Sequence, residues 1–220
     1  MDISIAQEFT IQCLASLSET RDTETGSHIF RTQHYVKILS EYLAKHLRFR
    51  YFLNDETIEI LYKSAPLHDI GKVGIPDRIL LKKGKLTEDE YEEMKRHTLI
   101  GRNVINKAEE RLGKKNSGNI YLNSAKDVAY THHEKWDGSG YPQGIKGDDI
   151  PIPGRLMALA DVYDALITER VYKAAFSHEK VIETIVNGKG KHFDPDIVDA
   201  FLQLETRFRQ IAREFADPVK

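Results

Sequence analysis

Helical periodicity recurs along almost the whole chain, whereas strand signals are nearly absent. Apolar residues return every three or four positions, which places them on one face of a helix. In the segment of about 27–47, for example, one stripe carries His28, Thr32, Tyr35, Leu39 and Tyr42. A chain of 220 residues is long enough for one domain with a sizeable core. We therefore predict a single all-α domain.

Local start and stop signals divide this pattern into separate helices. Asn54 or Asp55 is suited to cap a helix, and Thr87 to Glu90 read as a capping box. Glycines and a proline make residues 70–86 a loop, and Pro153 falls where a first helical turn tolerates it. The expected helices cover 4–18, about 27–47, 54 or 55 toward His68, 87 onward, 97–111, 124–134, about 154–168, 178–187 and 195–214.

Composition excludes several classes of protein. The net charge of −2 argues against a dedicated binder of nucleic-acid polymers, and no apolar run reaches the length of a membrane span. The single cysteine, Cys13, fits a reducing cytosol, so we predict a cytoplasmic protein. Its neighbours Ile11, Leu14 and Leu17 suggest a core thiol in the first helix. The apolar face of that helix offers two roles: a homodimer contact, or reception of a signal from an upstream domain.

Two adjacent histidines stand at the mouth of a glycine-rich turn, in the stretch THHEKWDGSGYP from Thr131 to Pro142. His132 shares a helical face with Ala125 and Val128, and His133 shares one with Ala125 and Ala129. A buried imidazole needs partners for both ring nitrogens. Backbone carbonyls would serve for a lone core histidine, but a tandem pair beside such a turn favours metal ligation.

A second histidine lies beside an acid in LHDIGK, where His68 and Asp69 precede Gly71. Imidazole and carboxylate ligands suit manganese, iron or zinc, and a bridging aspartate can hold two ions together. The same pair could equally be an ion pair at a helix end. Lys72 follows within reach of an anion beside the metals, although a surface lysine would have the same spacing.

Further candidates occur singly. His97 opens an expected helix, and Asp161 lies in the apolar run LMALADVYDAL, where an unpaired acid is costly to bury. Asp164, one turn later, either supports the metal ligands or faces solvent. Glu24 and His28 have the spacing of neighbours on one helical face. A capping acid and an unrelated histidine would explain them too.

These segments together resemble one known family. HDIGK at 68–72, HHEKWDGSGYP at 132–142 and ADVYDAL at 160–166 closely resemble the HD-GYP family of bacterial cyclic-dinucleotide phosphodiesterases. RDTETGSHIFRT near the start and RVYK at 170–173 are similar to it as well, so the likeness covers roughly residues 19–200. We expect an amino-terminal helix over 1–18 and the catalytic domain over 19–220. Thr98 stands where the family usually has proline, and 108–123 is longer than typical.

The resemblance implies an all-helical HD-type fold around a buried centre of two or three divalent ions, preferably iron or manganese, with zinc, nickel or magnesium as alternatives. The implied metal ligands are His68, Asp69, His97, His132, His133 and Asp161, with Glu24 and His28 completing a third site. Asp69 and Lys72 would be catalytic. The implied substrate contacts are Lys72, Tyr141, Pro142, Arg155 and Lys173. The implied supporting residues are Glu134, Asp137, Gly138, Gly140 and Asp164.

The activity implied is hydrolysis of cyclic di-GMP to linear pGpG, with a second cleavage to GMP as an extension. Hydrolysis of the mixed 3′,3′-cyclic GMP–AMP dinucleotide is the alternative. An inactive cyclic-dinucleotide sensor or docking module is an alternative of another class, although such a module would be expected to lose ligands. The resemblance also implies docking of a diguanylate cyclase (GGDEF) domain through the loop that contains Tyr141 and Pro142.

Overall fold

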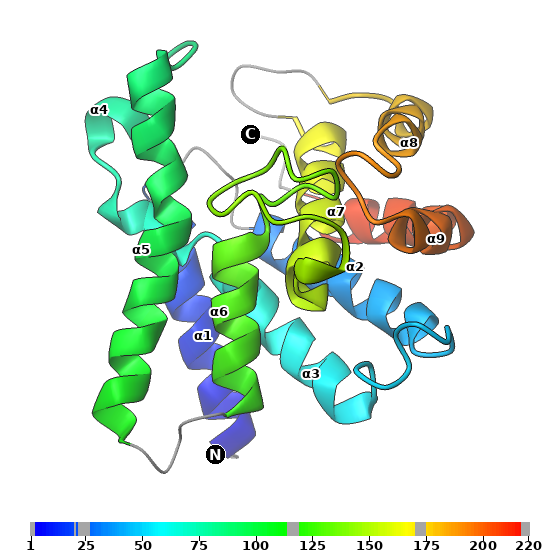
Figure 1. The fold of residues 1–220 in the computed structure, drawn as a ribbon, viewed down its shortest axis with the longest axis horizontal. Helices are drawn as coiled ribbons and strands as arrows, with labels where there is room; N and C mark the ends of the chain where they lie inside the picture. The colour runs from blue at the N-terminus through cyan, green and yellow to red at the C-terminus, as the bar shows by residue number, and fades with distance from the viewer. Residues whose placement is uncertain (1–2, 20, 22–26, 114–118, 170–174, 217–220) are drawn as a thin grey trace.

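A computed structural model of the chain describes residues 3–19, 21, 27–113, 119–169 and 175–216 (Figure 1). Within these ranges it contains α-helices and short 3-10 turns but no strand, apart from one isolated bridge between Lys189 and Phe193. The α-helices are α1 (Ile3–Glu19), α2 (Ser27–Leu43), α3 (Asp55–Ser64), α4 (Asp77–Leu80), α5 (Glu88–Leu112), α6 (Ile120–Thr131), α7 (Ile152–Ile167), α8 (His178–Asn187) and α9 (Pro195–Glu214). The prediction of an all-α fold is confirmed.

Side-chain caps explain where several helices begin. The Asn54 side chain accepts a hydrogen bond from the backbone of Thr57, and Thr87 and Glu90 form the expected capping box. α5 is one continuous helix, so His97 lies in its interior instead of opening a helix. α6 begins four residues earlier than expected because Asn119 caps the backbone N–H groups of Tyr121 and Leu122.

Two other segments also differ from the expected boundaries. α2 ends at Leu43, and the chain continues through turns to residue 52. α3 ends at Ser64, since Pro66 follows in a 3-10 turn, η1 (Ala65–Leu67). The expected loop at 70–86 contains a second 3-10 turn, η2 (Ile70–Gly74), and the short α4.

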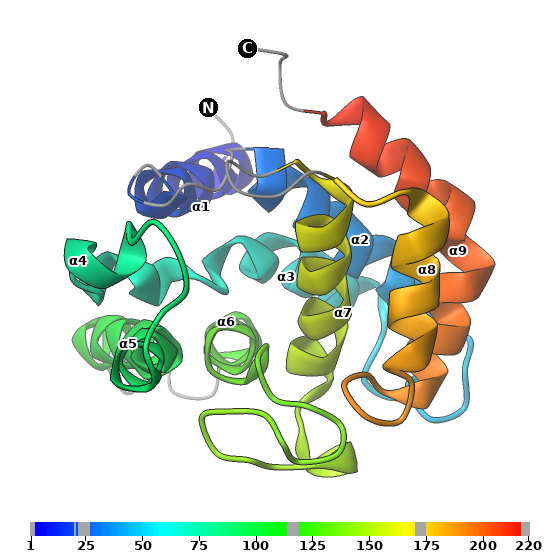
Figure 2. The same ribbon diagram turned by 90° about the horizontal axis from the view of Figure 1, so that it is seen from above.

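The helices form two groups with the chain around His68 between them. α5 lies alongside α6, and both contact the loop after α3, as Figures 1 and 2 show. On the other side α2 packs against α3, α7 and α9, and α8 covers α7 and α9. A long loop from His132 to Pro151 joins α6 to α7. The carboxyl end of α6 therefore approaches both groups.

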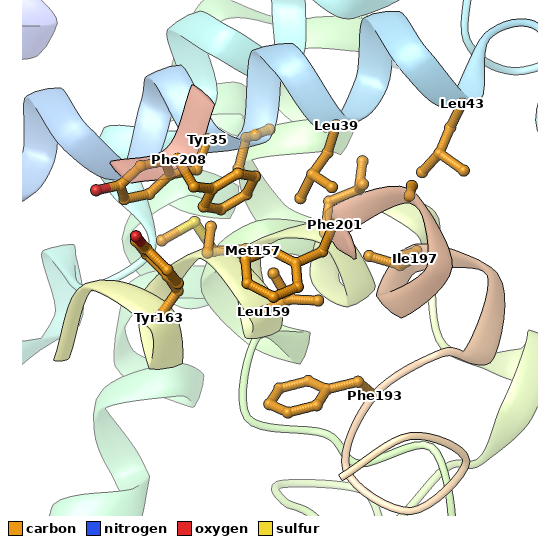
Figure 3. Close-up of a cluster of buried hydrophobic side chains, with 14 of the residues drawn as sticks. Tyr35, Leu39, Leu43, Met157, Leu159, Tyr163, Phe193, Ile197, Phe201 and Phe208 are labelled. Atoms are coloured by element: carbon orange, nitrogen blue, oxygen red, sulfur yellow. The ribbon is translucent and has the colours of Figure 1, made fainter. Parts of the chain in front are cut away.

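The main hydrophobic core lies between α2, α7 and α9 (Figure 3). Aromatic rings dominate it: the Tyr35 ring stacks on Phe208 with centroids 4.6 Å apart, and Tyr163 meets Phe208 edge to face. Aromatic pairs of these geometries stabilise by more than their buried area alone. This core fixes α2 and α7, the helices that carry His28 and Asp161.

The prediction of a core thiol at position 13 is wrong. Cys13 is exposed, and so are Phe9 (69%) and Leu17 (65%). α1 instead turns Ala15 and Ser18 inward. The apolar residues of this helix are spread over more than one face, so periodicity could not identify its buried face. Neither the 1–18 boundary nor a homodimer through the exposed face is tested by this arrangement, and both stay predictions.

No helix within the described ranges is long and apolar enough to cross a bilayer.

Candidate metal centre

Seven of the predicted metal ligands converge where η1, α2, α5, α6 and α7 meet. They form two groups, and within each group the ligand atoms lie within 4.8 Å of one another. The first group consists of Asp69, His97, His132 and His133, and the second of His28, His68 and Asp161. The structure thus brings together residues from five separate segments. Glu24 lies outside the described residues, so the role predicted for it as a ligand is not addressed.

Three of the histidines are oriented by backbone carbonyls of their own segments. The Nδ1 atoms of His68, His97 and His132 lie 2.9–3.0 Å from the carbonyl oxygens of Ala65, Met94 and Val128, respectively. A carbonyl only accepts hydrogen bonds, so each Nδ1 must donate one. In the neutral ring this leaves Nε2 with a lone pair. All three histidines therefore offer Nε2 as a metal ligand.

These lone pairs face one another across short distances. The Nε2 atoms of His97 and His132 are 3.4 Å apart, and those of His28 and His68 are 3.3 Å apart. When both rings of such a pair are neutral, the two nitrogens have no proton to share and repel each other. A cation between or beside them would turn the repulsion into ligation. This arrangement fits a metal centre better than a set of satisfied core histidines.

Asp69 lies between the two groups. Its Oδ1 is 3.3 Å from His97 Nε2, and its Oδ2 is 3.3 Å from His68 Nε2. Oδ1 is buried and has no hydrogen-bond partner among the described residues, a costly state for a carboxylate oxygen unless a ligand completes it. One carboxylate facing two groups of ligands is the arrangement needed for a bridging ligand.

The protonation states also suit cation binding. Burial alone would raise the pKa of Asp69, but Lys72 and His68 hold it well below its ordinary value. Burial lowers the pKa of His97 to about 4 and lowers that of His133 as well. The carboxylate is therefore ionised and these imidazoles are neutral at neutral pH, which is the state in which each can bind metal.

Lys72 lies beside the centre. Its Nζ is 2.7 Å from Asp69 Oδ2, and its side chain retains 15% of its exposure. The lysine is thus both a charge partner of the expected bridging ligand and a cation that reaches the surface of the site. This position agrees with the sequence-based expectation, and contact with substrate stays a prediction.

The loop after α6 folds Tyr141 back onto the centre. The Tyr141 ring stacks on His133 with centroids 4.7 Å apart, and its backbone N–H donates to the His133 carbonyl. Pro142 follows through a cis peptide bond and is exposed. Lys95 of α5 lies over the same ring at 5.6 Å, so tyrosine and lysine together border the site.

Glu134 holds this loop in place. Its buried carboxylate accepts backbone N–H groups from Gln143 at 2.7 Å and Gly144 at 3.1 Å. Gly140 has no room for a side chain, because a Cβ there would lie 2.3 Å from the backbone nitrogen of Lys135. Gly138 has φ +85°, and Asp137 accepts the N–H of Ser139. Four of the five residues predicted to support the site thus shape its loop.

Arg155 belongs to a different cluster. Its Nη1 donates to Asp194 and Asp148, each at 2.9 Å, and its guanidinium lies 5.7 Å from the Trp136 ring. Arg48 packs against the same ring and bonds to Asp194 as well. Arg155 is therefore not among the groups that gather at the centre, and phosphate contact by it stays a prediction. Lys173 lies outside the described residues.

Two residues beside the centre were not found or not placed by the sequence analysis. Asp164 is buried, with its carboxylate 2.8 Å from Nδ1 of the predicted ligand His28, so it does not face solvent. Arg31, which binds that carboxylate, was missed. Its position three residues after His28 on the same helical face was the available signal.

Comparisons of the sequence identify its relatives. A family model described as HD domain matches residues 16–197. A probable cyclic di-GMP phosphodiesterase of Vibrio cholerae is 56% identical over 96% of this chain and 47% of its own length. A cyclic di-GMP phosphodiesterase of the same organism is 54% identical over 98% of this chain and 43% of its length. A 3′3′-cGAMP-specific phosphodiesterase of Vibrio cholerae is 39% identical over 99% of this chain and 38% of its own length. The chain thus spans less than half the length of these relatives.

Solved structures show the same fold. An HDG"Y"P protein of Bdellovibrio bacteriovorus matches with a TM-score of 0.55 and 20% identity, over 83% of this chain and 54% of that one. A cyclic GMP–AMP-specific phosphodiesterase of V. cholerae matches with a TM-score of 0.52 and 19% identity, over 94% of this chain and 51% of that one. The fold and site define an all-helical protein with a histidine–aspartate centre able to hold metal. The chain belongs to the HD domain family, and its motifs are those of the HD-GYP group within it.

Proposed function

We propose that this chain is a metal-dependent phosphodiesterase that hydrolyses cyclic di-GMP. The observation that carries the proposal is the pair of ligand groups, with imidazole lone pairs facing one another inside them and with Asp69 of the first group 3.3 Å from His68 Nε2 of the second. The relatives named cyclic di-GMP phosphodiesterases, at 54–56% identity, support the choice of substrate. An inactive sensor would not need to keep every described ligand in a binding geometry.

The metal would be held by the seven described ligands, with Glu24 as the predicted eighth. Divalent ions there would polarise a phosphoryl oxygen and lower the pKa of water. Iron or manganese is the preferred choice by the family resemblance alone, since imidazole and carboxylate ligands also admit zinc or nickel. Two or three ions per chain are proposed. If Glu24 helps to hold a third, Glu24→Ala lowers the metal content of anaerobically purified protein from about three to about two.

The protein side chains would bind and orient the substrate. Lys72, next to the expected bridging carboxylate, is suited to neutralise a phosphoryl oxygen, and Tyr141 and Pro142 to border the bound dinucleotide. In the reaction, water oxygen bonds to phosphorus while the bond to the ribose 3′-oxygen breaks. That oxygen leaves with a proton, and the product is linear pGpG. A second hydrolysis of the same kind would give GMP.

Two further proposals concern the setting of the enzyme. The exposed loop around Pro142 is the proposed docking surface for a diguanylate cyclase (GGDEF) domain, supported by the family resemblance of its sequence. A cytoplasmic location stays the prediction from the sequence, since a substrate formed from nucleotides would be met there.

Turnover of cyclic di-GMP by the purified, metal-loaded protein tests the main proposal, with products separated by chromatography. His68→Ala combined with Asp69→Ala is expected to abolish hydrolysis and leave the circular dichroism spectrum helical. His46→Ala, which removes an exposed histidine outside the centre, is the matched control and should keep full activity. Near wild-type turnover in the double variant would reject the metal-dependent mechanism.

A further inference from the structure

His28 differs from the other oriented histidines of the centre in the partner of its Nδ1 atom. Nδ1 lies 2.8 Å from Asp164 Oδ2, whereas His68, His97 and His132 bond to backbone carbonyls. Its Nε2 faces the second ligand group, 3.3 Å from His68 Nε2 and 3.7 Å from Asp161 Oδ1. An ionised carboxylate only accepts hydrogen bonds, so His28 donates from Nδ1 and presents a lone pair at Nε2.

Asp164 is held in turn by Arg31. The guanidinium donates from Nε to Oδ1 at 2.7 Å and from Nη2 to Oδ2 at 2.9 Å, and both side chains are only 2% exposed. Two parallel bonds fix the carboxylate plane as well as its position. A buried ion pair often adds little to stability over an apolar pair of similar size. The need to orient the Asp164 carboxylate explains the presence of this ion pair better than a gain in folding stability does.

The same arginine reaches the end of α9. Arg31 Nη1 donates to the backbone carbonyl of Phe215 at 2.9 Å, and the Phe215 ring stacks on His34. α2, α7 and the end of α9 are thus joined by one guanidinium. The Arg31 side chain donates these hydrogen bonds to Asp164 and to the Phe215 carbonyl, which are far apart in sequence, and it therefore has little freedom to rotate.

We propose that Asp164 and Arg31 are positioning residues for metal ligation by His28. Asp164 selects the Nδ1–H tautomer and aims Nε2 at the second ligand group, and Arg31 holds Asp164 in the plane required for this. A hydrogen bond that a ligating histidine donates to a carboxylate also raises the basicity of the ring. The inference rests on the metal centre of the proposed function but not on its substrate.

Asp164→Asn is the first test, because it keeps the side-chain shape and removes the charge. Metal affinity is measured by competition of the purified full chain with a chelator for Mn²⁺ and Zn²⁺. The histidine tautomer in metal-free protein is measured from ring ¹⁵N chemical shifts in NMR. We expect binding at one class of site to weaken about 10- to 100-fold. The His28 ring should lose its preference for the Nδ1–H form. A role in packing alone would not change the tautomer.

Glu205→Gln is the matched control. His178 also lies against a carboxylate, with Nε2 2.6 Å from Glu205 Oε2, but neither residue belongs to the two ligand groups. Loss of the Glu205 charge should leave the metal affinity and the His28 tautomer unchanged. An equal loss of affinity in both variants would indicate a general effect on the fold and would overturn the proposal.

Arg31→Lys provides a second variant if Asp164→Asn folds poorly. Lysine keeps the positive charge but cannot make two parallel bonds, so Asp164 would lose its fixed plane. We expect weaker metal binding than in the wild type and a mixture of His28 tautomers. Wild-type affinity and tautomer in either folded variant would contradict the proposal. Neither measurement requires turnover, so an inactive but metal-binding protein would reject the proposed function alone.

Discussion

The backbone of Gly71 lies against the carbonyl oxygen of His97, so closely that a Cβ at position 71 would be 1.9 Å from that oxygen. This contact sets the distance between the loop that carries Asp69 and the helix that carries His97. Gly71→Ala must therefore move one of them. Overpacking typically costs about 1–3 kcal/mol. We expect a loss of that size in urea unfolding, together with weaker metal binding.

Gly101→Ala is the control for this prediction, because it faces the same contact from α5. A Cβ there would lie 3.4 Å from its nearest neighbours, which is close to ordinary contact. Alanine also favours a helix over glycine by about 1 kcal/mol. The variant should be about as stable as the wild type. Equal destabilisation of both variants would show that the spacing of loop and helix is not the cause.

Removal of metal should lower the thermal stability. A ligand present at 100 times its Kd stabilises the folded state by about 2.7 kcal/mol, which corresponds to roughly 5–10 °C in Tm for a chain of this size. Dialysis against a chelator and readdition of Mn²⁺, followed by calorimetry, measures the shift. His46→Ala should respond like the wild type, whereas His132→Ala should respond less. An unchanged Tm in the wild type would argue against a tight centre.

Loss of the Glu134 carboxylate should release the loop that carries Tyr141. Glu134→Ala removes the acceptor for the backbone N–H groups of Gln143 and Gly144, and hydrogen bonds to a charged group contribute about 1.5–3 kcal/mol. We expect KM for cyclic di-GMP to rise and metal content to stay unchanged. Asp137→Ala, which affects only the exposed turn at Ser139, is the control and should have a smaller effect.

The free energy of unfolding should decrease as the pH is lowered, partly because of His192. Burial, and secondly Lys135, lowers the pKa of this histidine to about 4. Its unfolded pKa is about 6.5, so the unfolded state binds more protons between these values, and lowering the pH favours unfolding. His192→Gln removes this contribution. The stability of the wild type relative to that variant should drop by about 2–3 kcal/mol between pH 7 and pH 4. A constant difference across that range would contradict the prediction.

The preferred substrate can be tested against one close competitor. Contacts to phosphate position any cyclic dinucleotide of the same ring size without reading its bases. Two relatives named cyclic di-GMP phosphodiesterases are 54–56% identical, whereas a relative named for cGAMP is 39% identical. We expect a higher kcat/KM for cyclic di-GMP than for cyclic GMP–AMP under identical metal loading. If kcat/KM were instead about tenfold higher for cyclic GMP–AMP, the assignment of cyclic di-GMP as substrate would be wrong, and the assignment as a phosphodiesterase would still hold.

The sequence predicted those features that depend on local spacing. α6 ends at Thr131, three residues before the expected end, with His132 as its C-cap and His133 next, yet the apolar stripe of this helix had already indicated that both histidines point inward. The capping box at Thr87 and the helix α9 were found for the same reason. The exposed Cys13 was placed wrongly, because its helix is apolar on more than one face.

Pairings between distant segments could not be found in this way. Arg31 and Asp164 are separated by 133 positions, and no spacing rule connects them. The position of Arg155 matched a family pattern, yet its carboxylate partner Asp194 belongs to the cap of another helix. Such contacts depend on how helices cross, which periodicity within one helix does not determine.

The long separation between the ligands of the second group has a consequence for biosynthesis. His28 and its partner Asp164 are 136 positions apart, and Asp161 lies on the same helix as Asp164. At a synthesis rate of about 5–20 residues per second, His28 waits on the order of ten seconds before α7 is made. A ribosome-bound chain that stops before α7 therefore lacks a complete second group. The ion can be enclosed there only after α7 has been synthesised.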